Sequence, residues 1–215
     1  MKVSTSFIAA LLALFMLAGY SCSDDDDKPE DETTDYFYYG EHSYLIVKKT
    51  KTWVEAAADA VSLGGYLVEI ESKAEQDAVY KAIQDSKISS TYTKVTDGGG
   101  IGYIWIGATD RYQEGTWIWN GGNQSGTFPM FWFGSNAGSA VGGSYVNWGG
   151  TAAGSLNEPD NFTDTTYSPN GQNAAAIGLA KWPAGSSDEL GRAGEWNDIA
   201  ETNKLYYIVE FDKIK

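Results

Sequence analysis

Cysteine and histidine are nearly absent from this chain of 215 residues, which contains one of each. Because Cys22 stands alone, no disulfide can form within the chain, and the fold must be held by its core. Because His42 stands alone, a metal site built from several histidines is excluded. The sequence also has no Walker glycine loop, no HExxH motif and no Ser-His-Asp arrangement around His42. We therefore expect a protein that is not an enzyme.

Positive charge is also scarce. There are 15 Lys and Arg residues against 29 Asp and Glu, which gives a formal net charge of −14. Binding to phosphates needs a basic surface, so this balance argues against a nucleic-acid partner. It is compatible with an extracellular module that binds a cation.

Aromatic residues and glycines are abundant. The chain has 8 Trp and 14 Tyr residues among its aromatics, together with 25 Gly. This combination suggests a loop-rich domain held together by rings. We expect most rings to lie in the core, and the remainder would suit stacking on sugars.

The N-terminus has the features of a leader. Residues 7–17 form an apolar run that is too short to span a bilayer, and it follows a basic start. Small residues then precede Cys22, an arrangement that resembles a bacterial lipoprotein signal with Cys22 as the lipidated first residue. The alternative is an ordinary secretory peptide with an incidental cysteine.

An acidic stretch follows the cysteine. Residues 23–27 resemble the export tag of surface lipoproteins in envelopes of the Bacteroidetes type. Residues 23–35 contain eight acids and one lysine, so this stretch cannot bury a core and should be a solvated tether. We therefore divide the chain into a signal peptide (1–21), a tether (22–35) and a folded domain (36–215). The expected location is the bacterial outer membrane, anchored by lipid and exposed at the cell surface.

The first part of the domain contains both helical and strand patterns. Residues 36–39 and 42–47 read as a pair of strands, because aromatic and β-branched residues dominate them. Thr52 and Glu55 match a capping box that opens a helix, which Gly64 and Gly65 end. The residues expected on the inner face of this helix are Trp53, Ala57, Ala60 and Val61.

A short strand and a second helix follow. Residues 66–70 read as the strand, and Ser72 with Glu75 forms a second capping box. The inner face of this helix should carry Ala78, Val79, Ala82 and Ile83. No helical period follows, so the sequence predicts an α+β fold with a β-rich second half full of loops.

A loop late in the chain carries a group of oxygen-bearing side chains. Glu158 and Asp160 flank a proline, which fixes φ and is compatible with a cis peptide bond. Asn197 and Asp198 form a second acid–amide pair. Ca²⁺ takes about 6–8 oxygen ligands from carboxylates, amide carbonyls and water. These side chains could form a calcium site if the fold brings the two stretches together.

These tripeptides also carry a family resemblance. Glu158-Pro159-Asp160 followed by Trp196-Asn197-Asp198 resembles the primary calcium and sugar site of C-type lectin domains. Residues 103–107 resemble the central strand of that family, and the similarity extends over about residues 36–212. The resemblance implies a C-type lectin-like fold, in which two helices flank a small antiparallel sheet with a long loop region, here without disulfides.

The resemblance implies a set of metal ligands: Glu158, Asp160, Gln172, Asn197 and Asp198. Gln172 stands where the family usually has a glutamate, so one charge is lost and we expect a weak site. The sugar would contact Glu158, Asp160, Gln172 and Asn197. Asp160 departs from both usual motifs, which leaves the class of sugar undecided. The alternative is that these residues make only turn hydrogen bonds.

A second calcium position is implied by Asp110, Glu114, Asn161 and Asn173. Asn161 stands where the family usually has an acid. The alternative for Glu114 is that it belongs to a simple turn.

Two further departures concern the core. The family's disulfide positions correspond to Ala60 with Val209 and to Ala174 with Ala200, which are apolar pairs suited to buried packing. An insertion at residues 128–144 contains an aromatic cluster. We expect it to close the core, the alternative being an extended sugar surface.

The resulting functional hypothesis is a calcium-dependent, carbohydrate-binding lectin-like domain on a cell-surface lipoprotein. Its partners would be a glycan and, through lipidated Cys22, a membrane. The alternative is a calcium-independent domain that binds a surface protein, as an adhesin or as a subunit of a complex. A glycosidase is disfavoured, because carboxylates gathered around a cation stay ionised.

Overall fold

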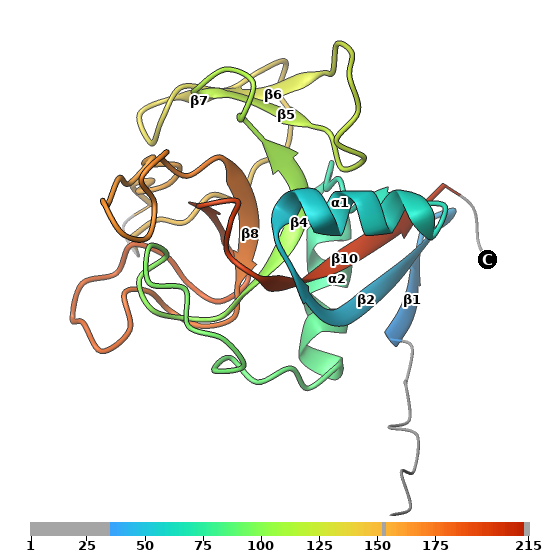
Figure 1. Cartoon of the computed structure of the whole chain (residues 1–215), viewed down its shortest axis with the longest axis horizontal. Coiled ribbons are helices and arrows are strands. Elements are labelled where there is room, and N and C mark those ends of the chain that lie inside the picture. The colour runs from blue at the N-terminus through green and yellow to red at the C-terminus, as the bar shows by residue number, and fades with distance from the viewer. Residues whose placement is uncertain (1–34, 152–153, 213–215) are drawn as a thin grey trace, which may run out of the picture. The chain divides into compact units, whose positions relative to one another are not determined.

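The computed structural model describes residues 35–151 and 154–212 (Figure 1). The predicted signal peptide, Cys22 and nearly all of the predicted tether lie outside these ranges. No helix within the described ranges is both long and apolar enough to cross a membrane.

One sheet organises the described part of the chain, and its strands run in the order β1-β2-β10-β4-β5-β6-β7. A short strand, β3, pairs with β10, while β8 pairs with β4 and carries β9 on its other side. The pairing of β10 with β4 is parallel, and the other pairings between these strands are antiparallel. The strands are β1 (Asp35–Tyr39), β2 (His42–Lys51), β3 (Tyr66–Leu67), β4 (Tyr103–Thr109), β5 (Thr116–Trp119), β6 (Met130–Phe133), β7 (Ser139–Ala140), β8 (Ala174–Gly178), β9 (Trp196–Ile199) and β10 (Leu205–Phe211).

The predicted α+β fold, with two helices flanking the sheet, is confirmed, although the sheet is larger than expected. Alternate residues of β4 explain the layering, because successive side chains of a strand point to opposite faces. Ile104 and Ile106 join one core cluster with α2 (Lys73–Asp85). Tyr103 and Trp105 join the other cluster with α1 (Trp53–Ser62).

Helix α1 begins with the predicted capping box. The Thr52 hydroxyl accepts from the Glu55 amide at 3.3 Å, and the Glu55 carboxylate accepts from the Thr52 amide at 3.0 Å. The prediction that Val61 faces inward is wrong, because its side chain is 44% exposed. At 100° per residue it lies beyond the buried stripe, which consists of Trp53, Ala56, Ala57 and Ala60.

Ser72 is the N-cap of helix α2 as predicted, but the reciprocal half of the capping box is absent. The Glu75 carboxylate turns away from Ser72 and accepts from the Glu71 amide and from the Tyr44 hydroxyl. Val79 and Ile83 are buried as expected. The preceding strand is shorter than predicted, since β3 contains only Tyr66 and Leu67.

The insertion at residues 128–144 contributes two strands to the sheet. In β6, the rings of Phe131 and Trp132 are buried among other aromatic side chains, so core closure is the better description of this segment. Phe133 is the exception, because it is 55% exposed. The four residues at the positions where the resemblance places the family's disulfides, Ala60, Val209, Ala174 and Ala200, are all buried.

Candidate functional site

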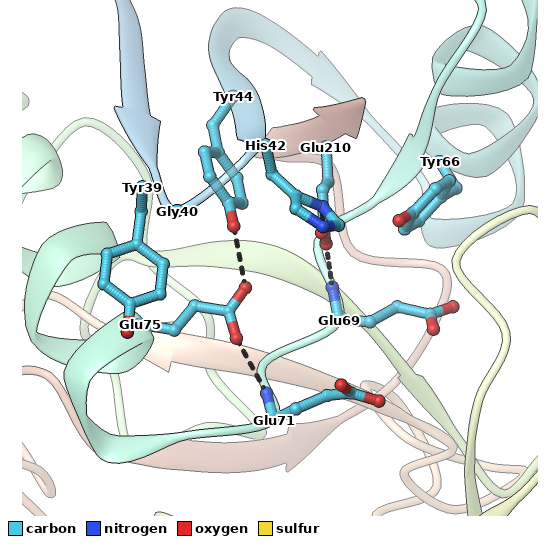
Figure 2. Close-up of a pocket in the computed structure, with 9 residues that line it drawn as sticks. All are labelled: Tyr39, Gly40, His42, Tyr44, Tyr66, Glu69, Glu71, Glu75 and Glu210. Atoms are coloured by element: carbon cyan, nitrogen blue, oxygen red, sulfur yellow. Dashed lines mark hydrogen bonds and ion pairs between the residues drawn. The ribbon is translucent and has the colours of Figure 1, made fainter. Parts of the chain in front are cut away.

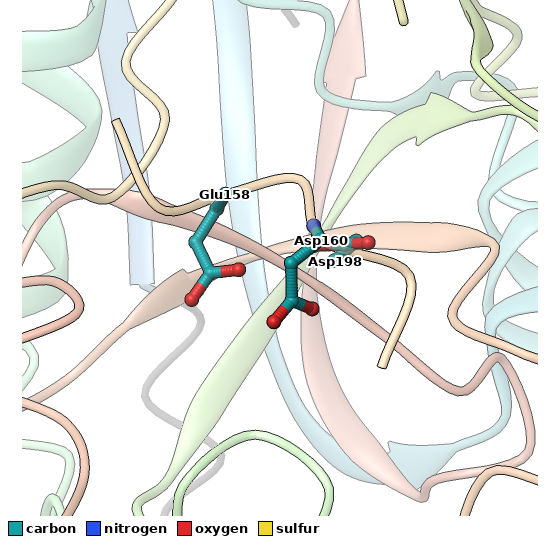
Figure 3. Close-up of side chains that lie close together, drawn as sticks. All are labelled: Glu158, Asp160 and Asp198. Carbon is teal, nitrogen blue, oxygen red and sulfur yellow. The ribbon is translucent and has the colours of Figure 1, made fainter. Parts of the chain in front are cut away.

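Three carboxylates from distant parts of the sequence meet at one point of the fold. Glu158 and Asp160 lie on the loop before β8, and Asp198 lies on β9. One oxygen from each of the three lies within 4.8 Å of the others. Figure 3 shows the carboxylates of Glu158 and Asp160 extending from the same loop, with Asp198 beside them. The fold thus brings residues 158–160 and 197–198 together.

Asp198 fastens the loop to the sheet. Its two carboxylate oxygens accept from the backbone amides of Asp160 at 3.1 Å and Asn161 at 2.8 Å. The loop bends at this point, where Asn161 has a φ of 49° and the Glu158-Pro159 peptide bond is cis. The buried strand β9 therefore fixes the position of the exposed Asp160.

Gln172 has both ends of its amide engaged. Its Oε1 accepts from the Phe162 backbone amide at 2.7 Å, while its Nε2 donates to the Asp97 carbonyl at 3.0 Å. Its own backbone amide donates to Asn161 Oδ1 at 2.8 Å. Gln172 lies on the wall of the same cavity as Glu158, Asp160 and Asn197.

Two oxygens of predicted ligands are buried and have no hydrogen-bond partner among the described residues: Glu158 Oε2 and Asn197 Oδ1. The other polar atom of each side chain is engaged. Glu158 Oε1 accepts from Trp182 Nε1 at 2.9 Å, and Asn197 Nδ2 donates to the Tyr103 hydroxyl at 2.9 Å. Buried polar atoms nearly always have a partner, so two such oxygens in one cavity suggest a ligand.

The electrostatics of the cluster reflect crowded negative charge in a buried place. Burial, reinforced by the charge of Asp198, raises the pKa of Glu158 to about 9. Burial also raises the pKa of Asp198 well above its ordinary range, and it raises the pKa of Asp160. A divalent cation would relieve this repulsion and favour the ionised carboxylates.

The available atoms fit calcium. All the predicted ligands offer oxygen atoms, from the carboxylates of Glu158, Asp160 and Asp198 and from the amides of Gln172 and Asn197. Oxygen-only donors with flexible geometry are what Ca²⁺ prefers. The assignment of these five side chains as ligands remains a prediction.

The cluster opens into a cavity of about 180 Å³. Residues 96–99 form part of its wall, and Phe162, Trp182 and Leu190 form another part. Phe162 is 48% exposed, which places an apolar ring at the cavity's edge. An aromatic residue two positions after Asp160 in a polar loop was a signal that the sequence reasoning missed.

The predicted second calcium position involves Asp110, Glu114, Asn161 and Asn173. Asp110 is buried, its Oδ1 has no partner, and its Oδ2 accepts from the Gly115 amide at 2.8 Å. Burial, with a contribution from Glu114, raises the pKa of Asp110 to about 7. The Asn173 carbonyl accepts from the Asp110 amide at 3.4 Å. The Asn161 amide donates to Asp198 Oδ2 and its Oδ1 accepts from the Gln172 amide, both at 2.8 Å, and its role in a second calcium position remains a prediction.

A separate pocket of about 210 Å³ lies beside the β1–β2 hairpin (Figure 2). His42 Nδ1 lies 2.6 Å from Glu210 Oε1, and the Tyr44 hydroxyl donates to Glu75 at 2.8 Å. Glu69 also lines this pocket, and none of the predicted ligands does so. All of these side chains have structural partners, so we regard the pocket as part of the scaffold.

Comparison with known families and proteins gives a consistent result. A family model described as "Lectin C-type domain" matches residues 49–211. Ladderlectin of Oncorhynchus mykiss is 31% identical over 91 residues, which cover 42% of this chain and 42% of that protein. Tetranectin of Homo sapiens is 33% identical over 75 residues, which cover 35% of this chain and 32% of that protein. The matched region thus spans less than half of the length of these curated relatives.

Solved structures show the same fold. The mouse scavenger receptor C-type lectin carbohydrate-recognition domain has a TM-score of 0.51 at 21% identity, covering 83% of this chain and 96% of that one. Its human counterpart has a TM-score of 0.51 at 19% identity, covering 83% and 97%. At these identities the likeness concerns the fold alone.

Proposed function

The chain belongs to the C-type lectin domain family, and on that basis we propose that it binds carbohydrate with the help of calcium. The observation that carries the proposal is the cluster of Glu158, Asp160 and Asp198, with unpartnered oxygens of Glu158 and Asn197 in the adjoining cavity. Members of this family are generally binding proteins, so the proposed role is recognition rather than catalysis.

The side chains around the cavity have distinct tasks in this proposal. Calcium, when bound, would offer coordination positions to two neighbouring hydroxyls of a sugar. The carboxylates of Glu158 and Asp160 would accept hydrogen bonds from those hydroxyls. The amide nitrogens of Gln172 and Asn197 each give one hydrogen to the protein, which leaves a second hydrogen for the ligand.

Phe162 provides an apolar surface beside these polar groups. Its backbone amide donates to Asp160 Oδ1 at 2.9 Å and to Gln172 Oε1 at 2.7 Å, so its backbone is held next to two predicted ligands. The ring is half exposed. Sugars have apolar C–H faces, and we propose that one of them packs on this ring.

A calcium titration tests the proposal. Binding to the native state alone raises its stability by RT ln(1 + [L]/Kd), so the thermal midpoint of the protein should rise with millimolar calcium. Asp198→Asn should abolish the rise. Asp164→Asn is the matched control, since Asp164 caps the same loop through the Thr166 and Tyr167 amides and is not part of the cluster. Its calcium response should match that of the wild type.

Carbohydrate binding needs a second measurement. A glycan array probed in calcium should give signals that chelator removes and that Glu158→Gln weakens. No thermal shift up to about 10 mM calcium, which exceeds the range of weak extracellular calcium modules, would overturn the calcium part of the proposal.

A second candidate function is calcium-independent binding of a surface protein. It is favoured by one observation: both oxygens of Asp198 and the Oε1 of Gln172 already accept backbone amides, so protein hydrogen bonds hold the loop. In that case the protein would capture a proteinaceous partner equally well in calcium and in chelator. Glu158→Gln would leave that capture unchanged.

We also propose that Cys22 anchors the protein to a bacterial outer membrane, with the acidic stretch holding the domain away from it. The sequence pattern supports this location. Cys22→Ser should move the protein from the membrane fraction to the soluble fraction. A mutant that stays with the membrane would rule out the lipid anchor.

A further inference from the structure

Two consecutive backbone carbonyls lie next to the amide side chains of the proposed site. The Asp97 carbonyl accepts directly from Gln172 Nε2 at 3.0 Å. The Gly98 carbonyl accepts from the Tyr103 hydroxyl at 2.7 Å, and that hydroxyl lies 2.9 Å from Asn197 Nδ2. Asp97 thus contacts the Gln172 amide directly, and Gly98 contacts the Asn197 amide through Tyr103.

The Tyr103 hydroxyl determines the orientation of the Asn197 side-chain amide. Two oxygens 2.7 Å apart need a proton between them, and the Gly98 carbonyl has none, so the Tyr103 hydroxyl donates to it. Its single proton is then used, and the hydroxyl can only accept from Asn197. Asn197 must therefore turn its NH₂ group to Tyr103, which directs its Oδ1 away from the hydroxyl, where it has no partner.

We propose that Tyr103 is a positioning residue for the binding site, because its hydroxyl holds the Asn197 amide with the oxygen available to a cation. The inference rests on the proposed calcium site. It adds a residue that touches neither the cation nor the sugar and acts only through Asn197.

Residues 97 and 98, which include the carbonyl that accepts from the Tyr103 hydroxyl, are held in place by further contacts. The Asp97 carboxylate accepts from the Ala200 backbone amide at 2.7 Å and from Asn203 Nδ2 at 3.0 Å. Gly98 packs against the Tyr103 ring so closely that a Cβ there would lie 2.8 Å from Tyr103 Cε2. The Tyr103 side chain is fully buried, so the hydroxyl has little freedom to choose another acceptor.

Removing the hydroxyl should affect calcium binding by a specific route. In Tyr103→Phe, the Asn197 amide loses the hydrogen bond that fixes its orientation. A half-turn would then present NH₂ hydrogens instead of an oxygen to the cation. Loss of a group that orients a metal ligand typically costs about 10- to 100-fold in metal affinity. We expect a rise of that size in the calcium Kd.

A matched control separates orientation from general destabilisation. The Tyr92 hydroxyl likewise joins two groups, since it donates to the Tyr103 carbonyl and accepts from the Tyr206 amide at 3.0 Å. Neither group is a predicted ligand. Tyr92→Phe should therefore lower the thermal midpoint while leaving the calcium Kd within about twofold of the wild type, since outer-shell effects need contact with a ligand.

A rescue variant supplies the decisive readout. Asn197→Asp replaces the amide by a carboxylate, which offers an oxygen whichever way it turns. Combined with Tyr103→Phe, it should restore most of the lost calcium affinity. A purely structural role for Tyr103 would not respond to this change.

Calorimetric titration of the full chain with calcium tests the proposal. A raised Kd in Tyr103→Phe, unchanged affinity in Tyr92→Phe and rescue by Asn197→Asp would support it. An unchanged Kd in Tyr103→Phe would overturn the inference and leave the calcium site standing. Absence of calcium binding in the wild type would overturn the proposed function, and the inference with it.

If Tyr103→Phe does not fold, nuclear magnetic resonance of the wild type gives the answer. The Asn197 side-chain amide should show one proton protected from exchange by Tyr103, both with and without calcium. Two protons that exchange alike would overturn the inference.

Discussion

Trp182 donates from its indole Nε1 to Glu158 Oε1 at 2.9 Å, which links a buried ring on one loop to a predicted ligand on another. The bond uses one carboxylate oxygen and leaves Oε2 without a partner. Trp182 therefore determines which oxygen of Glu158 is available. Sequence reasoning gave no reason to separate this tryptophan from the other core rings.

In the proposed calcium site, Trp182→Phe should weaken calcium binding and also lower the free energy of unfolding. The loss of a hydrogen bond to a ligand should raise the calcium Kd by about tenfold. The unfolding free energy should fall by about 1–3 kcal/mol, since a buried partner is left unsatisfied. Trp53→Phe is the control, because Trp53 Nε1 donates to the Ile106 carbonyl, which is not a predicted ligand. Equal effects of the two variants on the calcium Kd would contradict this role of Trp182.

Gly191→Ala should destabilise the loop that holds Trp182. A Cβ at Gly191 would lie 2.0 Å from Trp182 Cζ2, so the buried ring would have to move. Overpacking of this kind typically costs about 1–3 kcal/mol in the free energy of unfolding, measured here by urea denaturation. Gly122→Ala is the comparison, because its Cβ would meet only the side chain of Gln124 at 3.2 Å. A smaller loss in Gly191→Ala than in Gly122→Ala would argue against this packing.

The pocket beside the β1–β2 hairpin should make stability depend on pH. Burial is the main cause that raises the pKa of both Glu69 and Glu210 to about 7 from the ordinary 4.5. For both groups the folded state binds the proton more tightly than the unfolded state. The stability that Glu69 and Glu210 contribute to the folded state is therefore fully present below about pH 4.5 and is lost as the pH rises through about 7.

Urea midpoints measured from pH 4 to pH 8 test this dependence. Glu69→Gln should reduce the fall in stability between about pH 4.5 and 7, because it keeps the shape and removes the titration. The other titratable groups facing the pocket are Tyr39, His42, Tyr44, Tyr66, Glu71 and Glu75. Glu41→Gln is the control, since Glu41 is exposed and does not line the pocket. An identical pH profile for wild type and Glu69→Gln would refute the expectation.

Replacing Gln76 should lower the free energy of unfolding, because its side chain makes two buried hydrogen bonds. It is buried in α2, where Nε2 donates to the Gly194 carbonyl at 2.9 Å and Oε1 accepts from Trp196 Nε1 at 2.8 Å. Gln76→Ala leaves both partners unsatisfied, so the unfolding free energy should fall by about 2–4 kcal/mol. Gln84→Ala on the exposed side of the same helix should change it by less than about 0.5 kcal/mol, as measured by chemical denaturation. Similar losses in the two variants would contradict the predicted role of these hydrogen bonds.

Phe162→Ala should separate sugar binding from calcium binding. The half-exposed ring makes no side-chain bond to a predicted ligand, and its backbone amide, which does, is kept by alanine. We expect sugar affinity to fall by about tenfold, in line with about 1–1.5 kcal/mol for an aromatic contact, while the calcium Kd stays constant. Tyr167→Ala, another half-exposed ring on this loop, is the control. Unchanged glycan binding in Phe162→Ala would exclude the ring from the sugar site.

The sequence by itself determined the class of fold and the family. Hydrophobic periods and capping residues located both helices, because these are local properties of neighbouring side chains. The order of Glu158-Pro159-Asp160 and Trp196-Asn197-Asp198 identified the family resemblance, which is confirmed. The same local reasoning was wrong for Val61, which lies beyond the buried stripe of α1. It was also wrong for the Glu75 carboxylate, which accepts from Tyr44 on β2 instead of completing its capping box.

Only the tertiary structure decided how the site is built. It joined Asp198 to the backbone amides of Asp160 and Asn161, and it placed Asn161 in contact with Gln172 as well. It also placed Trp182 and Tyr103 against predicted ligands, although both read from the sequence as ordinary core rings. Hydrogen bonds such as these join residues 24 and 94 positions apart, and their direction depends on how each donor is shared. No local pattern contains that information, because it arises only when the sheet and the loops are packed together.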